Sequence, residues 1–272
     1  SHKEHITEDL QMKFGCCIQR KKDIRCVKAA GYDFFEFSGS VISRLSDCEF
    51  ADLCIESNRA GLPCVGFNAY SSGKPAIIGH NISNMETVRY AELLCRRGKS
   101  LGIDSLGIGS PNARRLPAGM DKVTADVQFI RFIRATAATA GEYGMSVLVE
   151  AVHSGMCNYL NTTADAIKIT RLVGLENVGM VLDFYHMSEM GEDYSLTAEA
   201  APYLRHVHLS TSGRNLWRGF PQEANADEYR EIFAVLKSIG YNGTVSIESS
   251  EFEFEQAKSC LELLRRLEAE NR

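Results

Sequence analysis

The chain has 272 residues, 44% of them hydrophobic, and a formal net charge of −5. That length is close to the ~250 residues typical of one eight-stranded α/β barrel, and the apolar share is enough for a sizeable core. The acidic balance and the lack of a basic stripe disfavour a nucleic-acid partner, and no run approaches the ~18 apolar residues of a membrane span.

Predicted strands and helices alternate through the chain. Strands are predicted over 13–18, 32–37, 63–67, 105–108, 146–150, 178–183, 205–209 and 244–248. Helices are predicted over 23–30, 47–59, 84–98, 121–143, 163–173, 195–201, 227–239 and 252–267. Several strand runs are continuously apolar, which is typical of parallel strands buried on both faces.

This alternation predicts an α/β fold, a single-domain (β/α)8 TIM barrel over 13–272. Residues 1–12 are expected to form an N-terminal tail, part of it foreign to the natural chain. A doubly wound open sheet is less favoured, because no glycine-rich phosphate turn follows the first strand. The nine cysteines have neither disulfide nor metal-knuckle spacing, which predicts a reducing compartment such as the cytoplasm.

Four polar residues each close one of the later strand runs. They are Glu150, Asp183, His208 and Glu248, separated by 33, 25 and 40 residues. Each interval accommodates a loop, a helix and the next strand. Because the C-terminal ends of barrel strands converge on one mouth, these side chains are expected to meet there. Three carboxylates and an imidazole suit one hard divalent cation, so the sequence predicts a metal-dependent enzyme.

Other polar residues are predicted to lie near that mouth. His186 follows Asp183 by three positions, in the expected loop, and His153 follows the fifth strand. Arg214 is six residues beyond His208, where a guanidinium can bind a substrate oxygen. Trp217 can form a wall of the pocket and pack against the apolar face of a sugar. Glu36 ends the second strand and can hydrogen-bond a site histidine.

His206 precedes His208 by two positions, so both side chains are expected on one face of the strand. If His208 points into the barrel, His206 is predicted to lie one layer lower.

The second half of the chain resembles the xylose isomerase-like barrel superfamily. The resemblance rests on residues 149–153, on the segment 178–187 with its Asp183-Phe-Tyr-His186, and on the strand ends at 206–210 and 240–248. More narrowly, the chain is similar to the sugar phosphate isomerase/epimerase and ketose 3-epimerase group. The resemblance covers nearly the whole chain, although its specific motifs lie within 146–250.

The resemblance implies a cytoplasmic isomerase of carbohydrate metabolism, with a sugar or polyol substrate and a dimeric or tetrameric assembly. Glu150, Asp183, His208 and Glu248 would ligate one divalent cation, with manganese favoured and Mg²⁺ or Co²⁺ as alternatives. The two glutamates would also exchange protons with the substrate carbon from opposite faces of an enediolate, while other residues would bind substrate. The resemblance implies that His186 and Arg214 bind substrate oxygens, and the positions of His153, Trp217 and Glu36 make them further candidate substrate-binding residues.

Three departures from the epimerase pattern affect the substrate end of the pocket. Met156 replaces the glutamate usually found six residues after Glu150, His153 replaces an asparagine, and 217–222 replaces a Pro-Gly-x-Gly segment. The same metal chemistry can expel a β-leaving group, so the alternative is a lyase or dehydratase acting on a keto-sugar, inosose or keto-glycoside. A non-catalytic barrel is a remote alternative.

Overall fold

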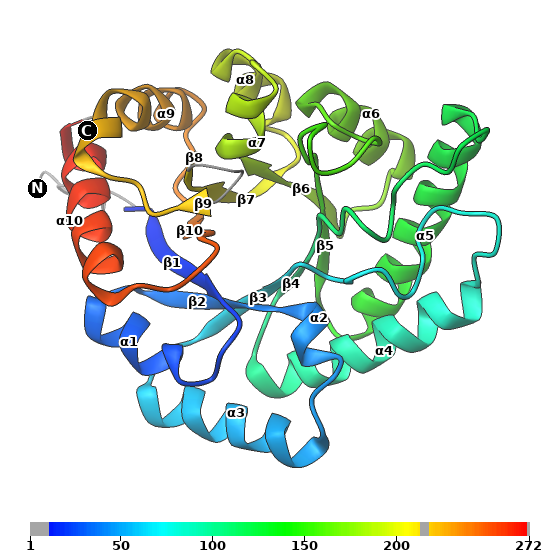
Figure 1. Cartoon of the computed structure of the whole chain (residues 1–272), viewed down its shortest axis with the longest axis horizontal. Coiled ribbons are helices and arrows are strands. Elements are labelled where there is room, and N and C mark those ends of the chain that lie inside the picture. The colour runs from blue at the N-terminus through cyan, green and yellow to red at the C-terminus, as the bar shows by residue number, and fades with distance from the viewer. Residues whose placement is uncertain (1–10, 213–217, 271–272) are drawn as a thin grey trace, which may run out of the picture.

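The computed structural model describes residues 11–212 and 218–270. Within this part of the chain, eight parallel strands close into a barrel ringed by helices (Figure 1). The barrel strands are β1 (Lys13–Ile18), β2 (Phe34–Ser38), β3 (Cys64–Asn68), β4 (Ser105–Ile108), β5 (Ser146–Glu150), β6 (Val178–Asp183), β7 (Leu204–Leu209) and β10 (Thr244–Ile247). The predicted TIM barrel is therefore confirmed.

Helices follow the strands and pack around them. They are α1 (Asp23–Ala30), α2 (Gly39–Ile42), α3 (Asp47–Ala60), α4 (Asn84–Leu101), α5 (Lys122–Glu142), α6 (Thr163–Val173), α7 (Phe184–Glu189), α8 (Thr197–Ala200), α9 (Ala226–Ser238) and α10 (Phe254–Glu270), with 3₁₀ turns at Tyr194–Leu196 and Glu223–Asn225. The sequence did not predict the short helices α2 and α7. His186 lies within α7, so its placement in a loop was wrong: the Asp183 side chain accepts a hydrogen bond from Tyr185 N and caps a helix there.

The strand register sets the height of each site residue along the barrel axis. Asp183 is opposite His208 between β6 and β7, and His208 is opposite Ser246 between β7 and β10. His206 is opposite Thr244, one layer below, as expected from the period of two along a strand. Polar side chains from distant parts of the chain therefore share one layer at the barrel mouth.

A small antiparallel ribbon stands above the barrel, formed by β8 (Thr211–Ser212) and β9 (Arg218–Gly219). Figure 1 shows it over the ends of β7 and β10. Two hydrogen bonds tie β9 to the segment after β10: Arg218 N donates to Ser250 Oγ, and Ser250 N donates to Arg218 O. This ribbon was not predicted from the sequence, and it holds the backbone of Arg218 in place.

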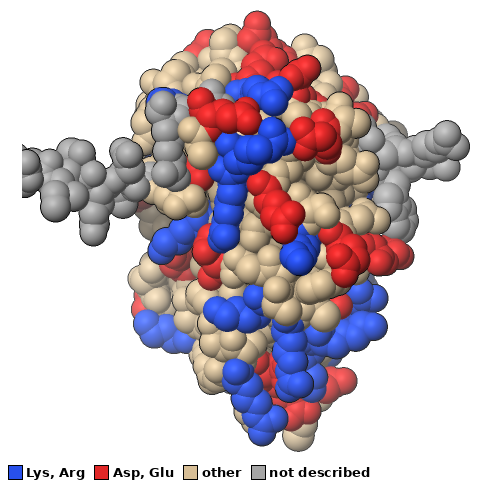
Figure 2. All heavy atoms as spheres, turned by 90° about the vertical axis from the view of Figure 1, so that its left-hand side faces the viewer, with Lys and Arg blue, Asp and Glu red and all other residues tan. Residues whose placement is uncertain are grey.

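The outer surface carries both signs of charge. On the face presented in Figure 2, basic and acidic side chains are interspersed rather than segregated. Ion pairs between elements join charges of opposite sign, including Arg266 with Glu223 and Arg25 with Glu56. Among the described residues, no helix is both long enough and apolar enough to cross a membrane.

Candidate metal and substrate site

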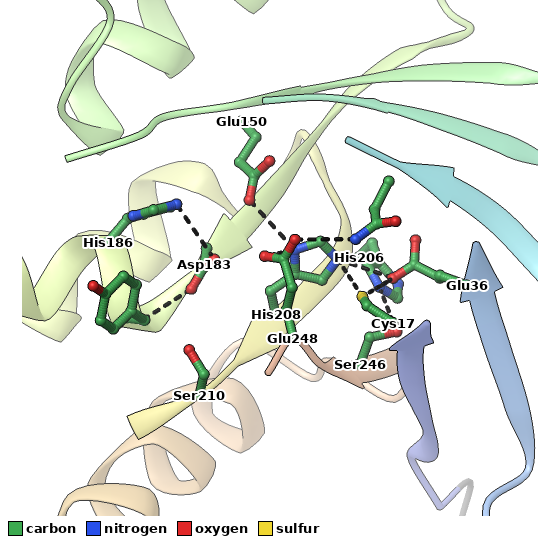
Figure 3. Close-up of polar contacts among 12 residues, drawn as sticks. Cys17, Glu36, Glu150, Asp183, His186, His206, His208, Ser210, Ser246 and Glu248 are labelled. Atoms are coloured by element: carbon green, nitrogen blue, oxygen red, sulfur yellow. Dashed lines mark hydrogen bonds and ion pairs between the residues drawn. The ribbon is translucent and has the colours of Figure 1, made fainter. Parts of the chain in front are cut away.

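The four strand-end residues gather at the barrel mouth. Glu150, Asp183, His208 and Glu248 each offer a ligand atom, and these atoms lie within 4.8 Å of one another. His208 Nδ1 lies 3.3 Å from Glu150 Oε1 and 3.5 Å from Glu248 Oε2 (Figure 3). Three of the four are buried, whereas the Glu248 side chain is 23% exposed. The cluster is thus largely shielded from water but open on the side of Glu248.

Glu36 fixes the orientation of the His208 ring. Its Oε2 accepts hydrogen bonds from His208 Nε2 and from His206 Nε2, each at 2.9 Å. Because the Glu36 carboxylate holds the Nε2 proton, Nδ1 is the ring nitrogen that faces the three other candidate ligands. His206 lies one layer below and is itself held by Thr244 Oγ1 at 2.7 Å.

Burial and charge shift the ionisation of these groups in opposite directions. Burial alone lowers the pKa of His208, but Cys17, Glu36 and Glu150 outweigh it and raise that pKa well above its usual range. Burial alone raises the pKa of Glu36, yet His206 and His208 hold it well below its usual range. Burial also raises the pKa of Glu150, a shift that His208 opposes. The raised pKa of His208 reflects the acidic groups packed around it, which a bound cation would also neutralise.

Contacts from other strands and loops position the two glutamates. Asn68, the last residue of β3, donates from Nδ2 to Glu248 Oε1 at 3.0 Å. Gly109, just after β4, leaves room for Glu150, because a Cβ there would lie 2.4 Å from Glu150 Oε2. Arg114 is fully buried and donates to the Glu150 carbonyl at 2.7 Å, which holds the end of β5. The Glu248 carboxylate and the Glu150 backbone are thus held by contacts from outside their own strands.

Arg218 brings a positive charge to the same site. Its guanidinium donates to Asp183 Oδ2 at 2.5 Å and pairs with Glu248 Oε2 at 2.7 Å, while Nε donates to Ser210 Oγ at 2.9 Å. It also lies over the Tyr185 ring, 4.7 Å from the centroid. This pairing raises the pKa of Arg218, so the guanidinium stays charged.

A cavity of about 290 Å³ opens beside the cluster. It is lined by Arg218, Glu248, Asn68, Met156 and Cys17, among others. Its size and mixed lining suit a small polar ligand. Met156, one of the three departures from the epimerase pattern noted in the sequence, is among the lining residues.

The two predicted pocket histidines pack behind this lining. His186 Nε2 is 3.6 Å from Asp183 Oδ2 and 3.5 Å from Arg218 Nη1, and its ring stacks on that of His153 at 5.2 Å. Burial, reinforced by Arg218, lowers the pKa of His186 well below its usual range, so the ring is neutral. Neither histidine is among the described residues that line the cavity.

The remaining predicted residues divide into two groups. Arg214 and Trp217 lie outside the described residues, so their roles stay predictions. Glu36 lies beneath His208 and hydrogen-bonds it, while its contact with substrate stays a prediction. Sequence reasoning missed Asn68 and Arg218. Asn68 could have been found, because it closes a strand run as the four predicted ligands do.

The donor set fits one divalent cation of the hard or borderline type. Carboxylate oxygens from three strands and one imidazole nitrogen converge, and the imidazole is held from behind by a carboxylate. That arrangement is typical of protein sites for Mn²⁺, Mg²⁺, Co²⁺ or Zn²⁺.

The chain is similar in sequence to a known epimerase and in fold to solved barrel structures. The L-ribulose 3-epimerase of Mesorhizobium japonicum is 29% identical over 263 residues, covering 90% of this chain and 80% of that protein. A D-psicose 3-epimerase from Clostridium cellulolyticum H10, solved with D-tagatose, matches with a TM-score of 0.81 at 19% identity, covering 94% and 99% of the two chains. The IOLI protein, solved with a bound zinc atom, matches with a TM-score of 0.72 at 19% identity, covering 96% and 98%.

A sequence profile supplies the family assignment. The profile described as xylose isomerase-like TIM barrel matches residues 24–269, which is most of the chain and includes all four strand-end residues. The two structural matches share the barrel fold with this chain. The protein therefore belongs to the xylose isomerase-like TIM barrel family.

Proposed function

We propose that the protein is a divalent-metal-dependent epimerase or isomerase of a sugar or polyol. Glu150, Asp183, His208 and Glu248 hold the cation, with Mn²⁺ favoured and Mg²⁺ or Co²⁺ as alternatives. The observation that carries this proposal is the convergence of their ligand atoms within 4.8 Å. The epimerase relative and the zinc bound by the IOLI protein support both the reaction class and the cation.

The chemistry requires the removal of a weakly acidic proton next to a carbonyl group. A bound divalent cation supplies electrostatic stabilisation of the negative charge that develops on the substrate oxygens. Glu150 on β5 and Glu248 after β10 come from strands three places apart around the barrel. They therefore flank a substrate from two sides, so that one carboxylate removes the proton and the other returns one to the opposite face.

Arg218 orients the substrate in this proposal. Its guanidinium lines the cavity, lies beside Asp183 and Glu248 and is supported by the Tyr185 ring. A fixed guanidinium donates in a defined direction to a carbonyl or hydroxyl oxygen. His186 is neutral and lies behind this lining, where its Nε2 can accept a hydrogen bond from Arg218 Nη1 and hold the guanidinium toward the substrate. Met156 makes one wall less polar, which favours a substrate that presents an apolar face there.

Proton NMR in D₂O tests the proposal. The Mg²⁺-loaded protein is mixed with a panel of ketoses, inososes and keto-glycosides, with EDTA-treated protein as a control. We expect deuterium to enter one carbon and a new epimer or isomer to appear. Glu150→Gln and Glu248→Gln should each abolish the exchange, whereas Glu262→Gln, an exposed carboxylate on α10, should leave it unchanged.

The same spectra separate the alternatives. Exchange accompanied by loss of a leaving group would replace the epimerase by the lyase or dehydratase. A panel without any exchange would contradict the proposal and favour a non-catalytic barrel. Metal affinity of the two glutamine variants, measured by calorimetry, shows whether lost exchange follows from lost cation or from a lost base.

A further inference from the structure

A second group of potential ligand atoms lies on the opposite edge of the His208 ring. Cys17 Sγ, Glu36 Oε2 and His208 Nε2 lie within 4.8 Å of one another, and all three residues are buried. The separations are 3.3 Å from sulfur to Glu36, 2.9 Å from Glu36 to His208 and 3.9 Å from sulfur to His208.

These separations resemble one face of a tetrahedral zinc site. At the usual Zn–S, Zn–N and Zn–O bond lengths, the ligand atoms stand about 3.3–3.6 Å apart. Shifts of a few tenths of an ångström would bring the three observed atoms to those spacings. Figure 3 shows the Cys17 sulfur beside Glu36 and His208, away from Asp183.

The cavity reaches this second group at Cys17. Cys17, at the end of β1, is one of the residues that line it. A cation that enters the cavity therefore meets the thiol as well as Glu248. The two donor sets differ in kind, because the strand-end cluster has no sulfur while the second group contains a cysteine. Thiolate selects thiophilic cations, and carboxylates suit Mg²⁺ and Mn²⁺.

We propose that Cys17, Glu36 and His208 form an inhibitory site for thiophilic divalent cations such as Zn²⁺ and Cd²⁺. On binding, the thiol proton passes to solvent and the imidazole proton moves from Nε2 to Nδ1, and the cation gains bonds to sulfur, nitrogen and oxygen. A neutral imidazole has one lone pair, so a cation on Nε2 leaves the proton on Nδ1. His208 then cannot ligate a second cation at Nδ1, and the two sites exclude each other.

Only this mutual exclusion depends on the proposed function. The second site itself depends on the three side chains and the cavity. Excess Zn²⁺ should therefore inhibit the Mg²⁺-loaded enzyme, whereas excess Mg²⁺ should not. Inhibition should weaken at least tenfold when the sulfur is removed.

Cobalt absorption tests the site without reference to activity. Co²⁺ is added to the full-length wild-type protein and to two variants, Cys17→Ser and Cys95→Ser. The control Cys95 is buried on α4, outside the cavity lining. We expect a near-ultraviolet thiolate-to-cobalt charge-transfer band in the wild type and in Cys95→Ser, and its loss in Cys17→Ser. The carboxylate cluster gives no such band because it contains no sulfur.

Cadmium-113 NMR of the wild type is the second measurement and needs no variant. We expect a resonance with the strong deshielding that sulfur ligation causes. The site would be refuted if neither the cobalt charge-transfer band nor the deshielded cadmium resonance appeared. A charge-transfer band of equal intensity in the wild type and in Cys17→Ser would also refute it. A cobalt band without any turnover on the substrate panel would support the second site and contradict the proposed function.

Discussion

Replacing Gly109 with alanine should disable the site while leaving the fold nearly intact. The added Cβ would lie 2.4 Å from Glu150 Oε2, whereas favourable contacts begin at about 3.5 Å. The carboxylate must therefore move by about 1 Å. Because Oε2 ends a rotatable side chain, this movement costs folding little. A displacement of ~1 Å at a reacting group lowers rates on the order of 100-fold, or ~2.7 kcal/mol in the barrier.

The assay combines deuterium exchange, calorimetric titration with Mg²⁺ and urea unfolding. Gly107→Ala is the matched control, because its Cβ would meet nothing closer than 3.6 Å. We expect Gly109→Ala to lose exchange and affinity, and Gly107→Ala to retain both. Parent-like exchange and affinity in Gly109→Ala would refute the position assigned to Glu150. Equal losses of exchange and metal affinity in both variants would mean that the substitutions disturb β4 rather than the Glu150 carboxylate.

Four further changes test the surrounding contacts. Glu36→Gln removes the negative charge behind His208 and should weaken metal affinity about 10- to 100-fold. Calorimetry measures this affinity, with Glu262→Gln as the control. Unchanged affinity would mean that Glu36 does not support His208 as a ligand. Asn68→Asp places a second negative charge 3.0 Å from Glu248 and should lower kcat/KM by at least tenfold, whereas a parent value would argue against that contact during turnover. Arg218→Lys keeps the positive charge but loses the planar guanidinium with its fixed set of donors, so KM should rise several-fold. An unchanged KM would exclude contact between Arg218 and the substrate. EDTA should lower the unfolding temperature, since a ligand at 100 times its Kd stabilises by ~2.7 kcal/mol; Mg²⁺ should restore it, and an unchanged temperature would contradict a bound cation.

Local sequence patterns were enough to locate most of the cluster. Glu150, Asp183 and His208 are found from the strands they close, because parallel barrel strands present their C-terminal ends at one mouth. Glu248 follows the same rule, although β10 ends one residue earlier, at Ile247. Asn68 also satisfies the rule and could have been included.

The helices around the site were less predictable. The run after Asp183 contains aromatic residues and a histidine, which have no strong helix preference. It forms α7 because the Asp183 side chain caps it and because Phe184 and Met187 are buried in the core. Those contacts come from the folded barrel, so His186 could not be assigned to a helix from its neighbours in sequence.

The sequence by itself determined the barrel and the four candidate ligands, because strand periodicity and strand ends are local properties. Only the tertiary structure decided which nitrogen of His208 faces them, since Glu36 lies 172 residues away along the chain. It also decided that Arg218 reaches Asp183 and Glu248, because β9 is held by Ser250 and the side chain by Ser210. Contacts between residues far apart in the chain leave no mark in local spacing, so these assignments required the fold.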